Sequence, residues 1–303
     1  MEIRTIHGDK LKALLDNNKL PYSDKENIEI AIDKYQSWRN NLEKLQGDTI
    51  SIVSQAVKLL NDYKNFIEIN LIFCSKEDFL YRQKGQLKLD NTIIEEFLPL
   101  VISKIFASNF KNTDIIIGPS KCITGIRFDT SIAKKADDSG MILKYKDQDF
   151  AISRPLFIQS SHSSSFVNSI IRETNISYLA CECKTNLDKT MFQEATATAF
   201  DLKLVIPSAK YILLCEWLDM IPINSKTTAI DEIIILRKAR RINETIRHDF
   251  SSASGRKLKI NEYCNYISSN PFVVDTFMRL IKHIEQLLNE VQNESEILSK
   301  GYF

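Results

Sequence analysis

Apolar and polar positions divide the chain into three spans. Over the first ninety or so residues apolar side chains recur at helical spacing, as in the stripe over 50–63. The middle changes to short apolar runs bounded by Gly, Pro or charge, which are typical of strands. The last forty residues return to helix after Pro271. This pattern predicts a helical region over 1–90, a mixed α/β core over 91–240 and a helical region over 241–303.

Several strands are expected in the middle span, and no clean linker separates it from its neighbours. A helical pattern enters the span at 92–108, and a second helix is expected over 188–202. The strand candidates are 114–119, which ends at a Gly-Pro pair, 123–128, 141–145, 150–153, which Pro155 limits, 176–184, 211–217 and 232–236. We therefore expect sub-regions of one compact body.

Composition narrows the classes of protein. In 303 residues, 40 Lys and Arg balance 39 Asp and Glu, so the net charge is +1 and any polyanion must be held by a local basic surface. The six cysteines form no C-x-x-C pair and no zinc spacing. No apolar leader and no run long enough to cross a bilayer is present. We expect a cytoplasmic protein with reduced thiols and no membrane contact.

Candidate chemistry lies at the end of the strand 176–184. In an extended segment Cys181 and Cys183 face the packing side, while Glu182 and Lys184 face the other side together. There the carboxylate can bind a hard cation, the lysine can orient or deprotonate a water, and the Cys183 backbone carbonyl can be a further ligand. The alternative is a solvated ion pair at a strand end. The same spacing recurs in 201–203, but at the end of a predicted helix, where the side chains diverge.

A hard-cation site needs a second acid. Asp149 opens the strand 149–153, and Phe150 and Ile152 lie on the opposite face of that strand. Asp147, two residues earlier on the same face, is the competing candidate. Both could instead belong to a hydrophilic loop that enters the strand.

These residues resemble a known family. An acid on one strand, then Glu-x-Lys on a later strand, then a helix and another strand is the pattern of PD-(D/E)xK nucleases. The segments 148–155 and 182–195, together with 117–119, are similar to the BbvCI-type group of type II restriction endonucleases, to which DdeI is similar. The similarity covers roughly 90–240. One departure is Gln148, which stands where the family motif has proline.

The resemblance implies a nuclease core with a central mixed sheet flanked by helices, and it implies roles for individual residues. Asp149 and Glu182 would hold Mg²⁺ together with the Cys183 carbonyl, and Lys184 would be the catalytic lysine. Gln193, or Glu194 beside it, would support the site from the following helix. A helix-surface amide is the alternative for Gln193.

A DNA-binding surface is expected from the basic segments. Arg154 directly follows the candidate catalytic strand, and a basic run is followed by a Ser/Gly-rich stretch that we expect to be a flexible phosphate clamp. The alternative is a solvated charged surface. The expected DNA contacts are Arg154, Arg237, Lys238, Arg240, Arg241, Arg256 and Lys257.

The resemblance therefore implies a Mg²⁺-dependent type II site-specific endonuclease that makes double-strand breaks at a short, near-palindromic site. One chain offers one site and cuts one strand, so duplex cleavage implies a homodimer or a heterodimer with a related subunit. The alternatives are a repair or structure-specific nuclease of the same fold, a catalytically silent DNA-binding protein, and an interaction scaffold.

Overall fold

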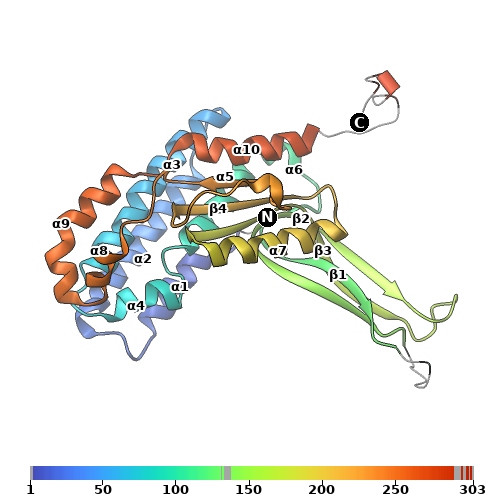
Figure 1. The fold of residues 1–303 in the computed structure, drawn as a ribbon, viewed down its shortest axis with the longest axis horizontal. Helices are drawn as coiled ribbons and strands as arrows, with labels where there is room; N and C mark the ends of the chain where they lie inside the picture. The colour runs from blue at the N-terminus through green and yellow to red at the C-terminus, as the bar shows by residue number, and fades with distance from the viewer. Residues whose placement is uncertain are drawn as a thin grey trace.

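A computed structural model describes residues 3–130, 132, 138–289, 295, 298–299 and 301, and it shows one sheet with helices on both faces (Figure 1). The N-terminal elements are α1 (Ile6–Leu15), α2 (Tyr22–Glu43), α3 (Thr49–Asn65), the π-helix η1 (Phe66–Phe73), α4 (Phe79–Gln86), α5 (Thr92–Ile105) and α6 (Ala107–Phe110). The strands are β1 (Ile116–Phe128), β2 (Met141–Ser160), β3 (Ile170–Leu187), β4 (Lys210–Leu218) and β5 (Glu232–Ile235). The remaining helices are α7 (Lys189–Val205), the short η2 (Ser225–Thr227), α8 (Glu244–His248), the short η3 (Asp249–Ser251), α9 (Ala253–Ser269) and α10 (Val274–Asn289).

The sheet is mixed and has the strand order β1-β2-β3-β4-β5. β2 is antiparallel to both β1 and β3, whereas β3, β4 and β5 are parallel. The helix α7 makes the crossover between the parallel neighbours β3 and β4, and the Asp188 side chain caps it by accepting a hydrogen bond from the Met191 N–H. This architecture confirms the expected mixed sheet flanked by helices.

The first three strands are longer than the sequence predicts. β1 continues through the Gly118-Pro119 pair because Gly118 adopts a φ of +134° and the register shifts between Gly118 and Ser120. β2 continues through Pro155 because its pairing with β1 ends at Ser153, while its pairing with β3 goes on. Beyond Ser153 the edge of β2 that faced β1 has no hydrogen-bonded neighbour, so a residue without an N–H is tolerated there. As a result β1, β2 and β3 extend as a long ribbon away from the helices (Figure 1).

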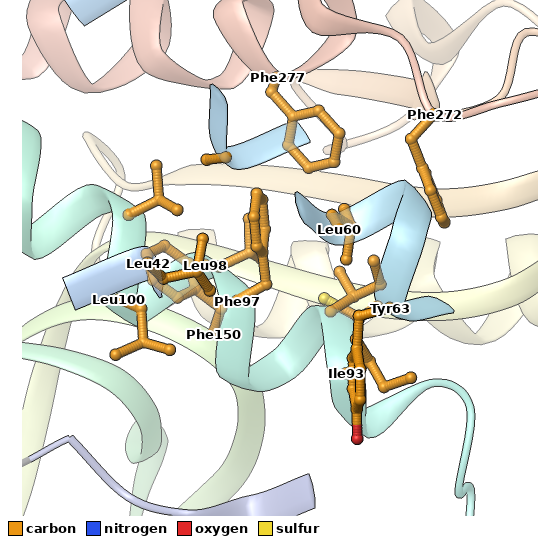
Figure 2. Close-up of a cluster of buried hydrophobic side chains, with 14 of the residues drawn as sticks. Leu42, Leu60, Tyr63, Ile93, Phe97, Leu98, Leu100, Phe150, Phe272 and Phe277 are labelled. Atoms are coloured by element: carbon orange, nitrogen blue, oxygen red, sulfur yellow. The ribbon is translucent and has the colours of Figure 1, made fainter. Parts of the chain in front are cut away.

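The two faces of the sheet pack against different helices. One face carries Cys181, Cys183 and Phe150, which join the side chains of α2, α3, α5 and α10 in the main core. Figure 2 shows Phe97 of α5 pointing toward Phe277 of α10, and their ring centroids lie 5.3 Å apart. The other face packs against α7 through residues such as Ala195 and Leu213. Because all three spans of the sequence contribute to the main core, the helical ends hold the sheet rigidly from one side.

Candidate active site

The two candidate acids meet where β2 separates from β3. The antiparallel ladder ends at the pair Phe150–Cys181, so Asp149 and Glu182 lie one step beyond it. There the Cys183 N–H donates to Asp149 Oδ2 at 2.9 Å in place of a ladder bond. Asp147 lies farther along β2, opposite Lys121 of β1, and is exposed. The structure therefore brings Asp149, rather than Asp147, against the Glu182–Lys184 segment.

Successive side chains of β3 point to opposite faces of the sheet, so the buried residues and the candidate site residues alternate along the strand. Cys181 and Cys183 are buried in the main core, while Glu182 and Lys184 are partly exposed on the opposite face. Lys184 Nζ lies 2.8 Å from Glu182 Oε1, and the Tyr211 hydroxyl of β4 donates to Glu182 Oε2 at 2.6 Å. Tyr211 is thus a further site residue, and its place on a buried strand hides it from motif analysis.

Electrostatics give the three groups different protonation behaviour. Burial raises the pKa of the Asp149 carboxyl, and the Cys183 N–H only partly offsets it. Burial would also raise the pKa of Glu182, but hydrogen bonds from Lys184 and Tyr211 outweigh it and lower that pKa. Burial would lower the pKa of Lys184, but Glu182 raises it. Lys184 is therefore a protonated ammonium beside an ionised Glu182 and can orient a water or stabilise developing negative charge.

A third carboxylate, Glu95 of α5, approaches the site from the packing side. Burial, followed by the charge of Asp149, raises the pKa of Glu95 to about 7. The Asn91 side-chain amide donates to Glu95 Oε1 at 2.9 Å and to the Cys183 carbonyl oxygen at 3.1 Å. Glu95 belongs to no motif, but two consecutive glutamates in an otherwise apolar helical stretch are a signal that could have found it.

The neighbouring Glu96 serves a different purpose. It accepts hydrogen bonds from the Tyr35 hydroxyl at 2.6 Å, from Arg39 at 2.6 Å and from the His7 N–H at 2.9 Å. These three partners lie in α1 and α2, so Glu96 joins α1, α2 and α5 and has no part in the site.

The two supporting candidates on α7 differ. Both Gln193 and Glu194 are exposed. The charge of Glu194 contributes to the raised pKa of Lys184, whereas the Gln193 side chain makes no hydrogen bond with any described residue. Of the two, Glu194 is the one that acts on the site electrostatically.

The competing Asp201–Lys203 pair diverges, as its helical position predicts. Asp201 pairs with Lys144 of β2 at 3.2 Å, while Lys203 pairs with Asp231 at 2.7 Å. Since the two side chains have separate partners, they form no joint site.

Two of the expected DNA contacts are wrong because their side chains are buried. Arg237 is 2% exposed, stacks on Phe272 and Trp217 and pairs with Glu216. Arg256 is 1% exposed and donates to the carbonyls of Phe73 and Phe250.

The expected flexible clamp is also wrong. Ser252 caps α9 by accepting from the Gly255 N–H, so Arg256 and Lys257 lie in a helix.

The other basic candidates lie at or near the surface. Arg154 pairs with Asp114, Lys238 with Asp275 and Arg241 with Asp219. Arg240 and Lys257 are exposed and make no ion pair with a described residue. These two are the side chains most readily available to phosphates.

A cavity of about 720 Å³ begins at the end of β3. It is lined by Thr185 and Asn186 of β3, by side chains of α4 and α9, and by the segment 241–251. Four of its lining residues are basic, namely Arg82, Lys84, Arg241 and Arg247. Asp78 and Asp90 also line it, and Lys84 pairs with Asp90 while Arg241 and Arg247 pair with Asp219, so the positive charge of the hollow is largely balanced.

The donor set at the site fits a hard divalent cation. Asp149, Glu182 and the Cys183 carbonyl all offer oxygen, the ligand type that Mg²⁺ prefers. Among the described residues, no group of three or more His, Cys, Asp or Glu side chains is arranged to hold a metal by itself. A bound cation would therefore need the backbone carbonyl and water as well.

The described helices include none long and apolar enough to cross a bilayer.

Comparison with known proteins agrees with this architecture. The solved structure of a native BbvCI A2B2 tetramer matches with a TM-score of 0.55 and 19% identity, covering 88% of this chain and 98% of that one. At this identity the match shows the fold, which is that of a restriction endonuclease.

A curated relative, the two-component response regulator ARR11 of Arabidopsis thaliana, is 27% identical over 186 residues, or 57% of this chain. The match spans 34% of that relative's length.

A model of the Bpu10I restriction endonuclease family matches residues 86–303, which is well over half of the chain and includes every candidate catalytic residue. The chain therefore belongs to the Bpu10I restriction endonuclease family.

Proposed function

We propose that the chain is a Mg²⁺-dependent type II restriction endonuclease subunit that hydrolyses DNA phosphodiesters at a short, near-palindromic site. The observation that carries the proposal is the hydrogen bond from the Cys183 N–H to Asp149, which joins the acid of one strand to the Glu-x-Lys of the next. Membership of the family supports DNA cleavage as the activity.

Each residue has a defined task in this reaction. Asp149, Glu182 and the Cys183 carbonyl would hold Mg²⁺, which neutralises a phosphoryl oxygen and lowers the pKa of water when it is bound. Lys184, held by Glu182, orients the attacking water and stabilises negative charge on the phosphate. Tyr211 fixes the rotamer of Glu182 from β4. Glu182 raises the pKa of Lys184 and keeps it protonated, and the charge of Glu194 adds a smaller contribution in the same direction.

We further propose an assembly of at least two catalytic subunits. One chain carries one such centre, and each centre cuts one strand, so a double-strand break needs two. The structural neighbour is an A2B2 tetramer, which supports either identical chains or a pair with a related subunit.

The six free cysteines fit a reducing cytoplasm, where the enzyme would meet invading DNA.

Digestion of a sequenced circular plasmid with this chain and Mg²⁺ tests the proposal. We expect discrete, reproducible fragments with a shared end sequence, and no cutting with EDTA or with Glu182→Gln. Preference for branched over linear substrates would favour a repair nuclease instead. Tight DNA binding without cleavage, even with a related subunit added, would favour a silent DNA-binding protein.

A further inference from the structure

Asn91 occupies the position before α5 where an asparagine normally caps a helix, yet it makes no capping bond. Asn224 and Asn243, at the same position before η2 and α8, each accept a hydrogen bond from a backbone N–H two residues on. Asn91 forgoes this local stabilisation, so its side chain is committed elsewhere.

Its partners belong to the candidate active site. One amide nitrogen, Nδ2, donates to the Cys183 carbonyl oxygen and to Glu95 Oε1. These hydrogen bonds join β3 and α5, two elements that are far apart in the sequence. They act on the backbone carbonyl between Glu182 and Lys184 and on the carboxylate that approaches from the packing side.

The other end of the amide is unsatisfied. Asn91 is 5% exposed, and its Oδ1 accepts no hydrogen bond from any described group. A buried acceptor without a donor costs about 1–3 kcal/mol, so native proteins seldom keep one unless a further donor is supplied. Mg²⁺ retains several of its waters when carboxylates bind it, and such a water is a donor.

We propose that Asn91 is a positioning residue for the metal site: it orients the Cys183 carbonyl and Glu95, and it offers Oδ1 to water on the bound cation. This inference rests on the proposed nuclease function. It assigns to Asn91 the orienting role that partners behind the direct ligands play in metal sites, where their loss weakens metal affinity about 10- to 100-fold.

The test measures metal binding directly. Mn²⁺ is titrated into the full-length protein, and its binding is measured by electron paramagnetic resonance. Mn²⁺ uses the same oxygen ligands as Mg²⁺. We expect Asn91→Leu, which removes donor and acceptor, to weaken Mn²⁺ binding about 10- to 100-fold. Asn91→Ala, which removes the same donor and acceptor without adding apolar bulk, should also weaken it. In cleavage assays the Mg²⁺ concentration for half-maximal rate should rise more than the rate at saturating Mg²⁺ falls.

Asn61→Leu is the matched control. The Asn61 amide also bridges distant segments, donating to the Phe272 carbonyl at 3.0 Å and accepting from the Phe272 N–H at 2.8 Å, but it is remote from the site. It should lower stability without changing Mn²⁺ affinity. If Asn91→Leu is folded and binds Mn²⁺ as the wild type does, the role of Asn91 is overturned and the nuclease proposal stands. If the wild type binds no Mn²⁺, both are overturned.

Discussion

Two charged clusters lie on neighbouring strands of the same sheet, and only one of them is open to solvent. Glu182 and Lys184 of β3 form a partly exposed pair at the strand end. Glu216 of β4 belongs to a fully buried cluster, in which Lys64 of α3 lies 2.6 Å from Glu216 and 3.1 Å from Glu68. The residue types are the same, but their surroundings differ.

The charged groups of the buried cluster pair mainly with one another. Lys64 also donates to the Asp90 carbonyl at 2.7 Å, and Arg237 covers Glu216 from the other side. Burial would lower the pKa of Lys64, but Glu216, Glu68 and Asp90 outweigh it and raise it, so the ammonium stays charged. The open cluster instead has an acid whose pKa is raised, Asp149, beside a Glu182–Lys184 pair that is partly exposed. Ionisable groups whose pKa is shifted and that solvent can reach are the ones able to bind a ligand.

The largest effect is expected from breaking the open cluster. Glu182→Gln or Lys184→Ala should lower the cleavage rate at least about 1000-fold, because each removes a group that acts on the reacting phosphate. DNA affinity without metal and the midpoint of thermal unfolding should change little. Asp201→Asn and Lys203→Ala, at the same spacing on α7, should cut at the wild-type rate. Wild-type cutting by either β3 variant would refute the assignment.

Breaking the buried cluster should affect stability. Lys64→Met leaves Glu216 and Glu68 buried without their ammonium partner, and we expect the free energy of unfolding to fall by about 3–5 kcal/mol in urea titrations. Lys144→Met removes an exposed pair with Asp201 and should cost at most about 1 kcal/mol. Equal decreases for the two variants would show that the buried cluster is not a structural unit.

Glu95→Gln should separate stability from activity. The pKa of Glu95 in the folded protein, about 7, exceeds its ordinary value of 4.5. The protonated side chain therefore contributes fully to stability below pH 4.5, and this contribution is lost as the pH rises from 4.5 to 7. The Gln variant cannot ionise and should be more stable than wild type at pH 8, by up to about 3 kcal/mol. It should nonetheless cleave more slowly. Glu96→Gln, beside it but paired with Arg39, should instead destabilise the protein.

The smallest effect concerns the DNA surface. Replacing Arg240 and Arg241 by Ala should make the dependence of log affinity on log salt shallower by about one to two units, because each arginine that neutralises a phosphate contributes about one unit to the slope. Lys58→Ala, on the exposed side of α3, should leave the slope unchanged. An unaltered slope in the double variant would exclude both arginines from the interface.

Motif and periodicity together predict much of this molecule. Alternation in 181–184 gives the correct faces of β3, and the apolar run after Asp149 favours the acid that the structure brings against the Glu182–Lys184 segment. Local patterns cannot give contacts between distant elements: Glu95 and Asn91 reach the site only because α5 packs under β3. They also misjudge Arg237 and Arg256, because an arginine satisfied by carbonyls and aromatic faces inside a core looks the same in sequence as one facing DNA.

The end of the β2–β3 ladder at Phe150 and Cys181 has a consequence for how this enzyme can vary. The loop that joins the two strands, 161–169, can lengthen or shorten without moving the acids, because the paired strands fix their alignment. A single residue inserted between that loop and Glu182 would slide β3 by one position, sending the glutamate into the core and a cysteine to the face where Glu182 now lies. Natural and engineered diversity should therefore collect at the tip of the ribbon and avoid its base.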